Sequence, residues 1–231
     1  MSESLAVSLP HPTPSVAGSW IKANTLAALI NAAMGLIALL LSHAFGAHHP
    51  DASSFGKVVV FLAHFLASGL GFAAFATLNG RVLREKIPAF PLRTWIIAHL
   101  VVGLLLGLYV GHSALQPLQM NHERALEMSY VWMGWLIFVG PGIVIVALVL
   151  GGFQAFLMRN VAQGLGAWVG FWVLAGVLCI FVYGLVLHLD NPFASIISAI
   201  MSQGVGFLAA IVITIVMLPA VAWLRPRQHS V

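Results

Sequence analysis

Formal charges divide the chain into long apolar stretches. Asp, Glu, Lys and Arg are absent from six intervals: 23–50, 58–80, 94–122, 128–158, 160–189 and 191–224. A helix needs about 20 apolar residues to cross the hydrocarbon core of a bilayer, and each interval supplies them. The runs are too long and unbroken for the strands of a membrane barrel. The pattern predicts six transmembrane helices, near 20–44, 57–79, 94–116, 129–157, 165–188 and 195–223.

The composition agrees with a membrane protein. Hydrophobic residues make up 61% of the chain and charged residues 7%, against about 25% charged residues in a soluble domain. We expect an all-α, polytopic six-helix bundle that occupies residues 19–224 as one membrane domain. A Pro- and Ser-rich leader, 1–18, is expected to be disordered, and 225–231 form a short tail.

Basic residues mark the ends of the predicted helices. With the N-terminus inside, eight of the ten Lys and Arg residues fall on the cytoplasmic side, and only Lys57 and Arg124 fall outside. Short cytoplasmic loops carry such an excess, so both termini are predicted to be cytoplasmic, in a multi-pass protein of the plasma (bacterial inner) membrane. Because the basic residues form no single face, nucleic acid is not expected as a partner.

Aromatic residues recur near the predicted inner helix ends. Trp20, Trp95, Trp168 and Trp223 all lie there. Tryptophan is enriched at membrane–water interfaces, so we interpret these four residues as interface anchors.

Histidines and acidic residues gather on the predicted outer side. Seven of the ten histidines and four of the six acidic residues lie there. Imidazole and carboxylate groups suit transition metals. The candidate metal ligands are His43, His48, His49, Asp51, His64, His112, His122, Glu123, His188 and Asp190. A pH sensor, or polar turns without a bound metal, are the alternatives, and 48–51 has the composition of a turn.

Two histidines are predicted to lie within the hydrocarbon, His64 and His99. Ionisable residues at this depth are functional candidates, although a hydrogen bond to a neighbouring helix would also explain them. His99 and His112 are 13 residues apart on one predicted helix, which suits at most one haem with two histidine ligands. The cofactor is therefore left open between a transition metal and, less favoured, haem b.

Glycines spaced four apart predict close helix packing. They are Gly103, Gly107 and Gly111 on the third helix and Gly166 and Gly170 on the fifth. Such a groove serves packing within the chain or a homo-oligomer. Pro141 predicts a kink in the fourth helix. The similar segments 71–75 and 152–156 indicate either two related hairpins or convergence.

No catalytic dyad, triad or phosphate loop is visible, so an enzyme is not favoured. Asn31, Gln154, Ser202 and Gln203 are polar residues at membrane depth that would line a path or bond helices together. The leading hypothesis is a transport or permease-type component for a small solute or transition metal. The alternatives are a structural or assembly subunit of a larger membrane complex, and an electron-transfer subunit with haem.

Overall fold

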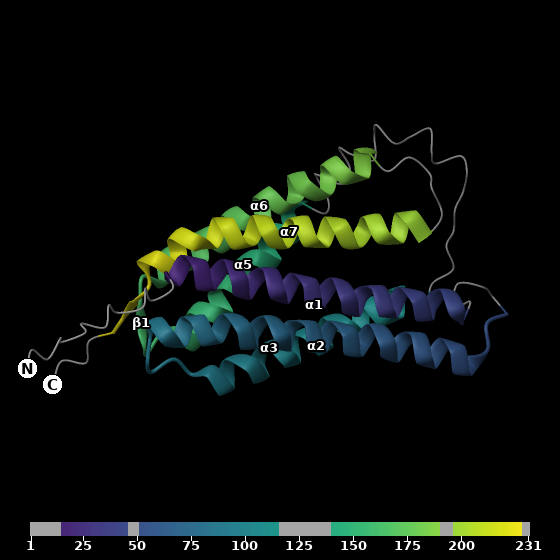
Figure 1. Ribbon diagram of the computed structural model, residues 1–231, viewed down its shortest axis with the longest axis horizontal. Helices are drawn as coiled ribbons and strands as arrows, with labels where there is room; N and C mark the ends of the chain where they lie inside the picture. Colours follow the sequence, from purple (N-terminus) through teal and green to yellow (C-terminus); the bar gives the residue numbers. More distant parts are fainter. Residues whose placement is uncertain (1–14, 46–50, 116–139, 190–195, 228–231) are drawn as a thin grey trace, which may run out of the picture.

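The computed structural model describes residues 15–45, 51–115, 140–189 and 196–227. Six α-helices make up nearly all of these ranges, which confirms the all-α class (Figure 1). They are α1 (Val16–Ala44), α2 (Ser54–Lys86), α3 (Leu92–Ser113), α5 (Gly140–Met158), α6 (Leu165–Leu189) and α7 (Ile196–Trp223). Five of them are long and apolar enough to cross a membrane by length and composition. In α7 the apolar stretch is Phe207–Trp223.

The first two helices begin earlier than predicted because serine caps them. α1 starts at Val16, within the segment assigned to the leader, where Ser15 Oγ accepts from Gly18 N at 3.1 Å. Ser53 Oγ accepts from Gly56 N at 3.1 Å at the start of α2. These bonds satisfy backbone donors that a helix leaves unpaired at its first turn.

α2 also continues beyond its predicted end. Its 33 residues span about 50 Å at 1.5 Å per residue, more than the roughly 30 Å of hydrocarbon. The last turns of α2 carry Arg81, Arg84, Glu85 and Lys86, beyond the uncharged run that ends at residue 80.

The predicted kink at Pro141 falls at the edge of the described residues. Pro141 is the second residue of α5 in the described range, so the kink stays a prediction. The predicted helical residues 129–139 lie outside the described residues.

The described helices form a ring in which each one packs mainly against two neighbours. The order around the ring is α3, α2, α1, α7, α6 and α5, and the slight contact between α5 and α3 closes it. Neighbours run in opposite directions, as Figure 1 shows for α1, α2 and α7. The start of α1 and the end of α7 lie side by side at one end of the ring.

A small ladder ties this end of the ring together. β1 (Ala162–Gln163), between α5 and α6, pairs antiparallel with β2 (Arg225–Pro226), after α7. These short strands were not predicted. Lys86 Nζ donates to Val221 O and, at 2.7 Å, to Ala222 O. A cation at the last carbonyls of α7 is favourable because it complements the helix dipole.

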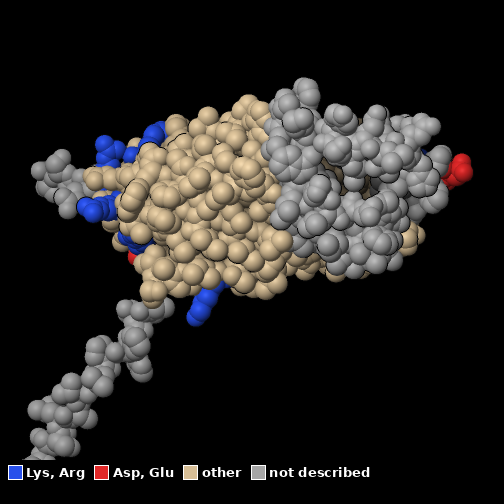
Figure 2. Space-filling view, turned by 90° about the horizontal axis from the view of Figure 1, so that it is seen from above, with Lys and Arg blue, Asp and Glu red and all other residues tan. Residues whose placement is uncertain are grey.

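We call this the basic end, and its opposite the far end. Figure 2 shows Lys and Arg side chains gathered toward the basic end, while the described surface beyond them is uncharged up to the far end. The basic end carries Arg81, Arg84, Lys86, Arg93, Arg159, Arg225 and Arg227. The far end of the described ring carries His43, Asp51, Lys57 and His112.

Candidate functional site inside the helix ring

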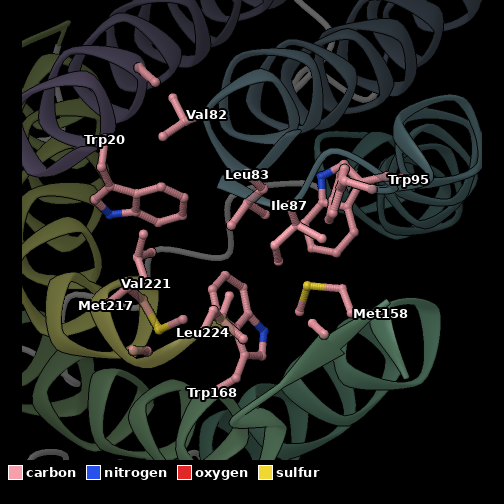
Figure 3. Packing of buried hydrophobic residues seen from close by; sticks show 14 of the residues in the cluster. Trp20, Val82, Leu83, Ile87, Trp95, Met158, Trp168, Met217, Val221 and Leu224 are labelled. Carbon is pink, nitrogen blue, oxygen red and sulfur yellow. The ribbon is translucent and has the colours of Figure 1, made fainter. Parts of the chain in front are cut away.

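Three tryptophans from three helices close the ring near its basic end. Trp20 of α1, Trp95 of α3 and Trp168 of α6 are 2%, 1% and 1% exposed. They surround apolar side chains from α2, α5 and the end of α7, as Figure 3 shows. We call this cluster the aromatic plug: Trp20, Leu83, Ile87, Trp95, Met158, Trp168, Met217 and Leu224.

The anchor interpretation is wrong for these three tryptophans. Among the four, only Trp223 is exposed, at 61%. The other three lie in or near the first turns of helices that start at the basic end, on the side that faces the ring interior. A partial signal was present in the sequence, since Trp20 and Trp95 are each followed four residues later by a polar residue, Asn24 and His99. Residues four apart share a helix face, so an interior polar layer beside the tryptophans was implied.

The first element of this polar layer is a pair of asparagines. Asn24 Nδ2 of α1 donates to Asn79 Oδ1 of α2 at 2.8 Å, and Asn79 Nδ2 returns a bond to Asn24 Oδ1 at 3.2 Å. Both residues are buried, at 4% and 0% exposed. The reciprocal bonds use one donor and one acceptor of each amide and fix α1 against α2.

The second element is a chain of bonds that links α3, α5 and α6. His99 Nδ1 lies 2.8 Å from Trp95 O, and His99 Nε2 lies 2.9 Å from Gln154 Nε2. Trp168 Nε1 donates to Gln154 Oε1 at 3.0 Å. His99 and Gln154 are each 2% exposed.

The donors along this series of hydrogen bonds determine the protonation state of the His99 imidazole. Trp168 N–H requires an acceptor, so the Gln154 oxygen faces it and the Gln154 amide group donates to His99 Nε2. His99 Nε2 must then carry a lone pair, and Nδ1–H donates to Trp95 O. His99 is therefore neutral, and both ring nitrogens are occupied. Binding of iron or another metal at His99 would require the Gln154 bond to break.

A third polar contact lies near the far end. Ser42 Oγ donates to Ala38 O at 2.9 Å and lies 2.9 Å from His64 Nε2. Since the serine has one proton and gives it to Ala38, His64 Nε2 donates to Ser42. This bond joins α1 to α2. It agrees with the second of the two expectations for His64, a hydrogen bond to a neighbouring helix.

The predicted metal ligands are only partly described. His43, Asp51 and His112 are exposed, and His64 is half-buried against Ser42. No three His, Cys, Asp or Glu side chains in the described ranges lie close enough together to hold a metal ion. His48, His49, His122, Glu123 and Asp190 lie outside the described residues, and the side chain of His188, in α6, is not described. Metal binding at this rim stays a prediction.

The glycines of α3 lie against α2. A Cβ at Gly103 would stand 2.6 Å from Phe72 Cβ, one at Gly107 2.7 Å from Phe65 O, and one at Gly111 2.9 Å from Phe61 Cδ2. Real Cβ atoms do not come so close, so these three positions allow the two helices to approach.

The second predicted glycine pair behaves differently. Gly166 and Gly170 are exposed, and a Cβ at either would meet no atom within 4 Å. Their face of α6 points away from its neighbours, so they take no part in packing among the described helices.

The two hairpins suspected of being related each bring a tryptophan to the plug. Segments 71–75 and 152–156 lie on α2 and α5, and the next helices, α3 and α6, begin near Trp95 and Trp168. Gln154 lies in the second segment, whereas the matching residue of the first is Ala73, so only α5 supplies the central amide.

In comparisons with known proteins, no family model, curated protein or solved structure matches this chain.

Proposed function

We propose that this chain is a transport-type component of the plasma membrane that passes a small solute through the ring. The observation that carries the proposal is the uneven filling of the ring. Most of the large, fully buried side chains of the described residues lie in the aromatic plug or next to it. Nearer the middle of the helices, the buried residues whose side chains the structure describes include many small ones: Ala27, Ala28, Ala38, Ala147, Ala175 and Ala209.

Small buried residues let neighbouring membrane helices approach closely. They also leave less side-chain volume to fill the centre of a six-helix ring than large residues would, and this supports a path through the ring. A transporter needs one end closed while the other admits the solute. The aromatic plug supplies that closed end.

The junction between α3 and α5 is suited to opening. Over the ranges that the structure describes, these two helices make the weakest neighbour contact in the ring. Among the described residues, the side-chain hydrogen bond that crosses it is His99–Gln154. Opening there would separate the plug residues Trp95 and Met158 without disturbing the glycine packing of α2 on α3.

The charge distribution supports an orientation with the basic end in the cytoplasm. The excess of Lys and Arg at this end is typical of cytoplasmic loops. In this orientation the plug closes the cytoplasmic side, and the rim that bears His43, Asp51 and His112 faces outward. A transition metal captured at the rim is then one candidate for the transported cargo, and a neutral solute is the other.

Flux through reconstituted protein tests the proposal. Purified protein in liposomes is given small neutral solutes, followed by light scattering, and Zn²⁺, Ni²⁺ or Mn²⁺, followed by an enclosed chelating dye. We expect at least one of them to enter faster than into empty liposomes. Trp168→Ala should increase leakage by opening the plug, whereas the matched variant Trp223→Ala should behave like the natural chain. If no solute or metal enters faster, the transport proposal fails, and a stoichiometric co-purifying protein would then favour an assembly subunit.

A further inference from the structure

Asn31 interrupts the burial pattern of α1 near the middle of the helix. The face of α1 that turns inward carries Trp20, Asn24, Ala27, Ala38 and Ser42, all buried. Asn31 follows Asn24 by seven residues and precedes Ala38 by seven, so it belongs to the same face. Asn31 is nevertheless exposed.

This face of α1 points into the ring. Trp20 Nε1 donates to Thr214 O of α7 at 3.2 Å, and Asn24 bonds with Asn79 of α2. Because α7 and α2 are the two neighbours of α1, a face that touches both looks between them, toward the interior. Asn31 therefore lies, exposed, on the side of α1 that turns toward the ring interior.

Gly71 of α2 makes room for the Asn31 side chain. A Cβ at Gly71 would collide with Asn31 Oδ1. Gly71 shares its face of α2 with Ser68 and His64, three and seven residues earlier. Ser68 and His64 are half-buried, so the α2 wall beside Asn31 also contains polar groups that are not fully enclosed.

The Asn31 amide forms no hydrogen bond among the described residues. An amide in an apolar medium without a partner costs about 1–3 kcal/mol by protein mutational data and more in hydrocarbon. Asn24 and Asn79, one level closer to the basic end, avoid this cost by pairing. Asn31 avoids it if water or a solute reaches the interior at this level.

We propose that Asn31, beside Gly71, forms a binding subsite for a small uncharged solute that both donates and accepts hydrogen bonds, such as an amide or a polyol. The subsite rests on the proposed transport function, since it places that solute on the path. Residues 23–50 and 58–80, which contain both helix walls, hold no formal charge. An ion would find no counter-charge from these walls, and an amide alone is a poor ligand for transition metals.

Access to the subsite is tested with single cysteines. Cys179, buried with Sγ 3.9 Å from Ala209 O, is first replaced by alanine. Asn31→Cys is compared with Leu29→Cys, which lies two residues away on the opposite face and is 52% exposed. We expect a membrane-impermeant thiol reagent to label Asn31→Cys and not Leu29→Cys. Equal labelling of both, or protection of both, would overturn the subsite.

Binding is tested by protection and by flux. Acetamide or glycerol should slow labelling of Asn31→Cys, whereas acetate and Zn²⁺ at the same concentration should not. In liposomes, Asn31→Leu should reduce acetamide or glycerol flux about tenfold, the effect of one lost hydrogen bond, and Asn31→Gln should retain part of the flux.

The outcomes separate the two proposals. Labelling and protection without flux in the natural chain would leave the subsite standing and remove transport. Flux that is unchanged in Asn31→Leu, with no labelling of Asn31→Cys, would leave transport standing and remove the subsite.

Discussion

Several polar side chains inside this protein are tolerated because their donors and acceptors are matched to one another. Gln154 is the clearest case, since its amide group donates to His99 and its oxygen accepts from Trp168. The sequence identified Gln154 and His99 as unusual at membrane depth, but it did not identify them as partners. They are 55 residues apart, and only folding brings their helices together.

Replacing Gln154 tests this matching at the residue scale. Gln154→Leu keeps a similar volume and leaves His99 Nε2 and Trp168 Nε1 without partners, each at a cost of about 1–3 kcal/mol. We expect a lower thermal unfolding temperature in detergent and a lower midpoint in denaturant. Gln163→Leu, an exposed change in β1, is the matched control and should unfold like the natural chain.

A double variant separates hydrogen bonding from packing. The double variant His99→Leu/Gln154→Leu should lower the free energy of unfolding by less than the sum of the two single changes. Gln154→Leu alone leaves His99 Nε2 unpaired, and His99→Leu removes that imidazole. Strict additivity would show that the His99–Gln154 bond contributes nothing to stability.

At the scale of helices, close approach depends on where a side chain is missing. α2 and α3 meet along Gly103, Gly107 and Gly111, and α1 meets α2 at Gly71. The spacing of glycines in the sequence correctly directed attention to α3. It could not distinguish that groove from the exposed pair Gly166 and Gly170, because spacing says nothing about which face of a helix has a neighbour.

Gly107 and Gly170 therefore make a matched pair of alanine substitutions. At Gly107 the new Cβ would meet the Phe65 backbone at 2.7 Å, so α3 must move away from α2, at a cost of about 1–3 kcal/mol. At Gly170 the space is open, and the higher helix propensity of alanine should be neutral or stabilising by up to about 1 kcal/mol. Denaturant titration of the two variants measures the difference. Equal destabilisation would contradict the assigned packing faces.

At the scale of the whole molecule, the chain closes on itself as a ring. The last helix returns beside the first, and β2 then pairs with β1 between α5 and α6. The three helices that begin at the basic end, α1, α3 and α6, each contribute one tryptophan to the plug. The plug consequently depends on contributions from nearly the whole length of the chain.

The ring makes a prediction about which side of the membrane each end faces. In a Cys179→Ala background, Asp51→Cys at the far end and Arg227→Cys at the basic end are both exposed. With an impermeant thiol reagent added to intact cells, we expect Asp51→Cys to be labelled and Arg227→Cys to be labelled only after the membrane is opened. Labelling of both from the same side would contradict the antiparallel ring across the bilayer.

The sequence by itself determined that the chain is helical, where most of its helices run, and at which end its positive charge accumulates. These properties follow from local hydropathy and from the thickness of a bilayer, which any stretch of about 20 residues expresses alone. Only the tertiary structure decided which helix faces turn inward. It buries Trp20, Trp95 and Trp168 in the plug and leaves Asn31, on the same face of α1 as Trp20, exposed. Lipid is as apolar as a protein core, so apolar residues surround these helices on every side and leave no stripe that marks the interior.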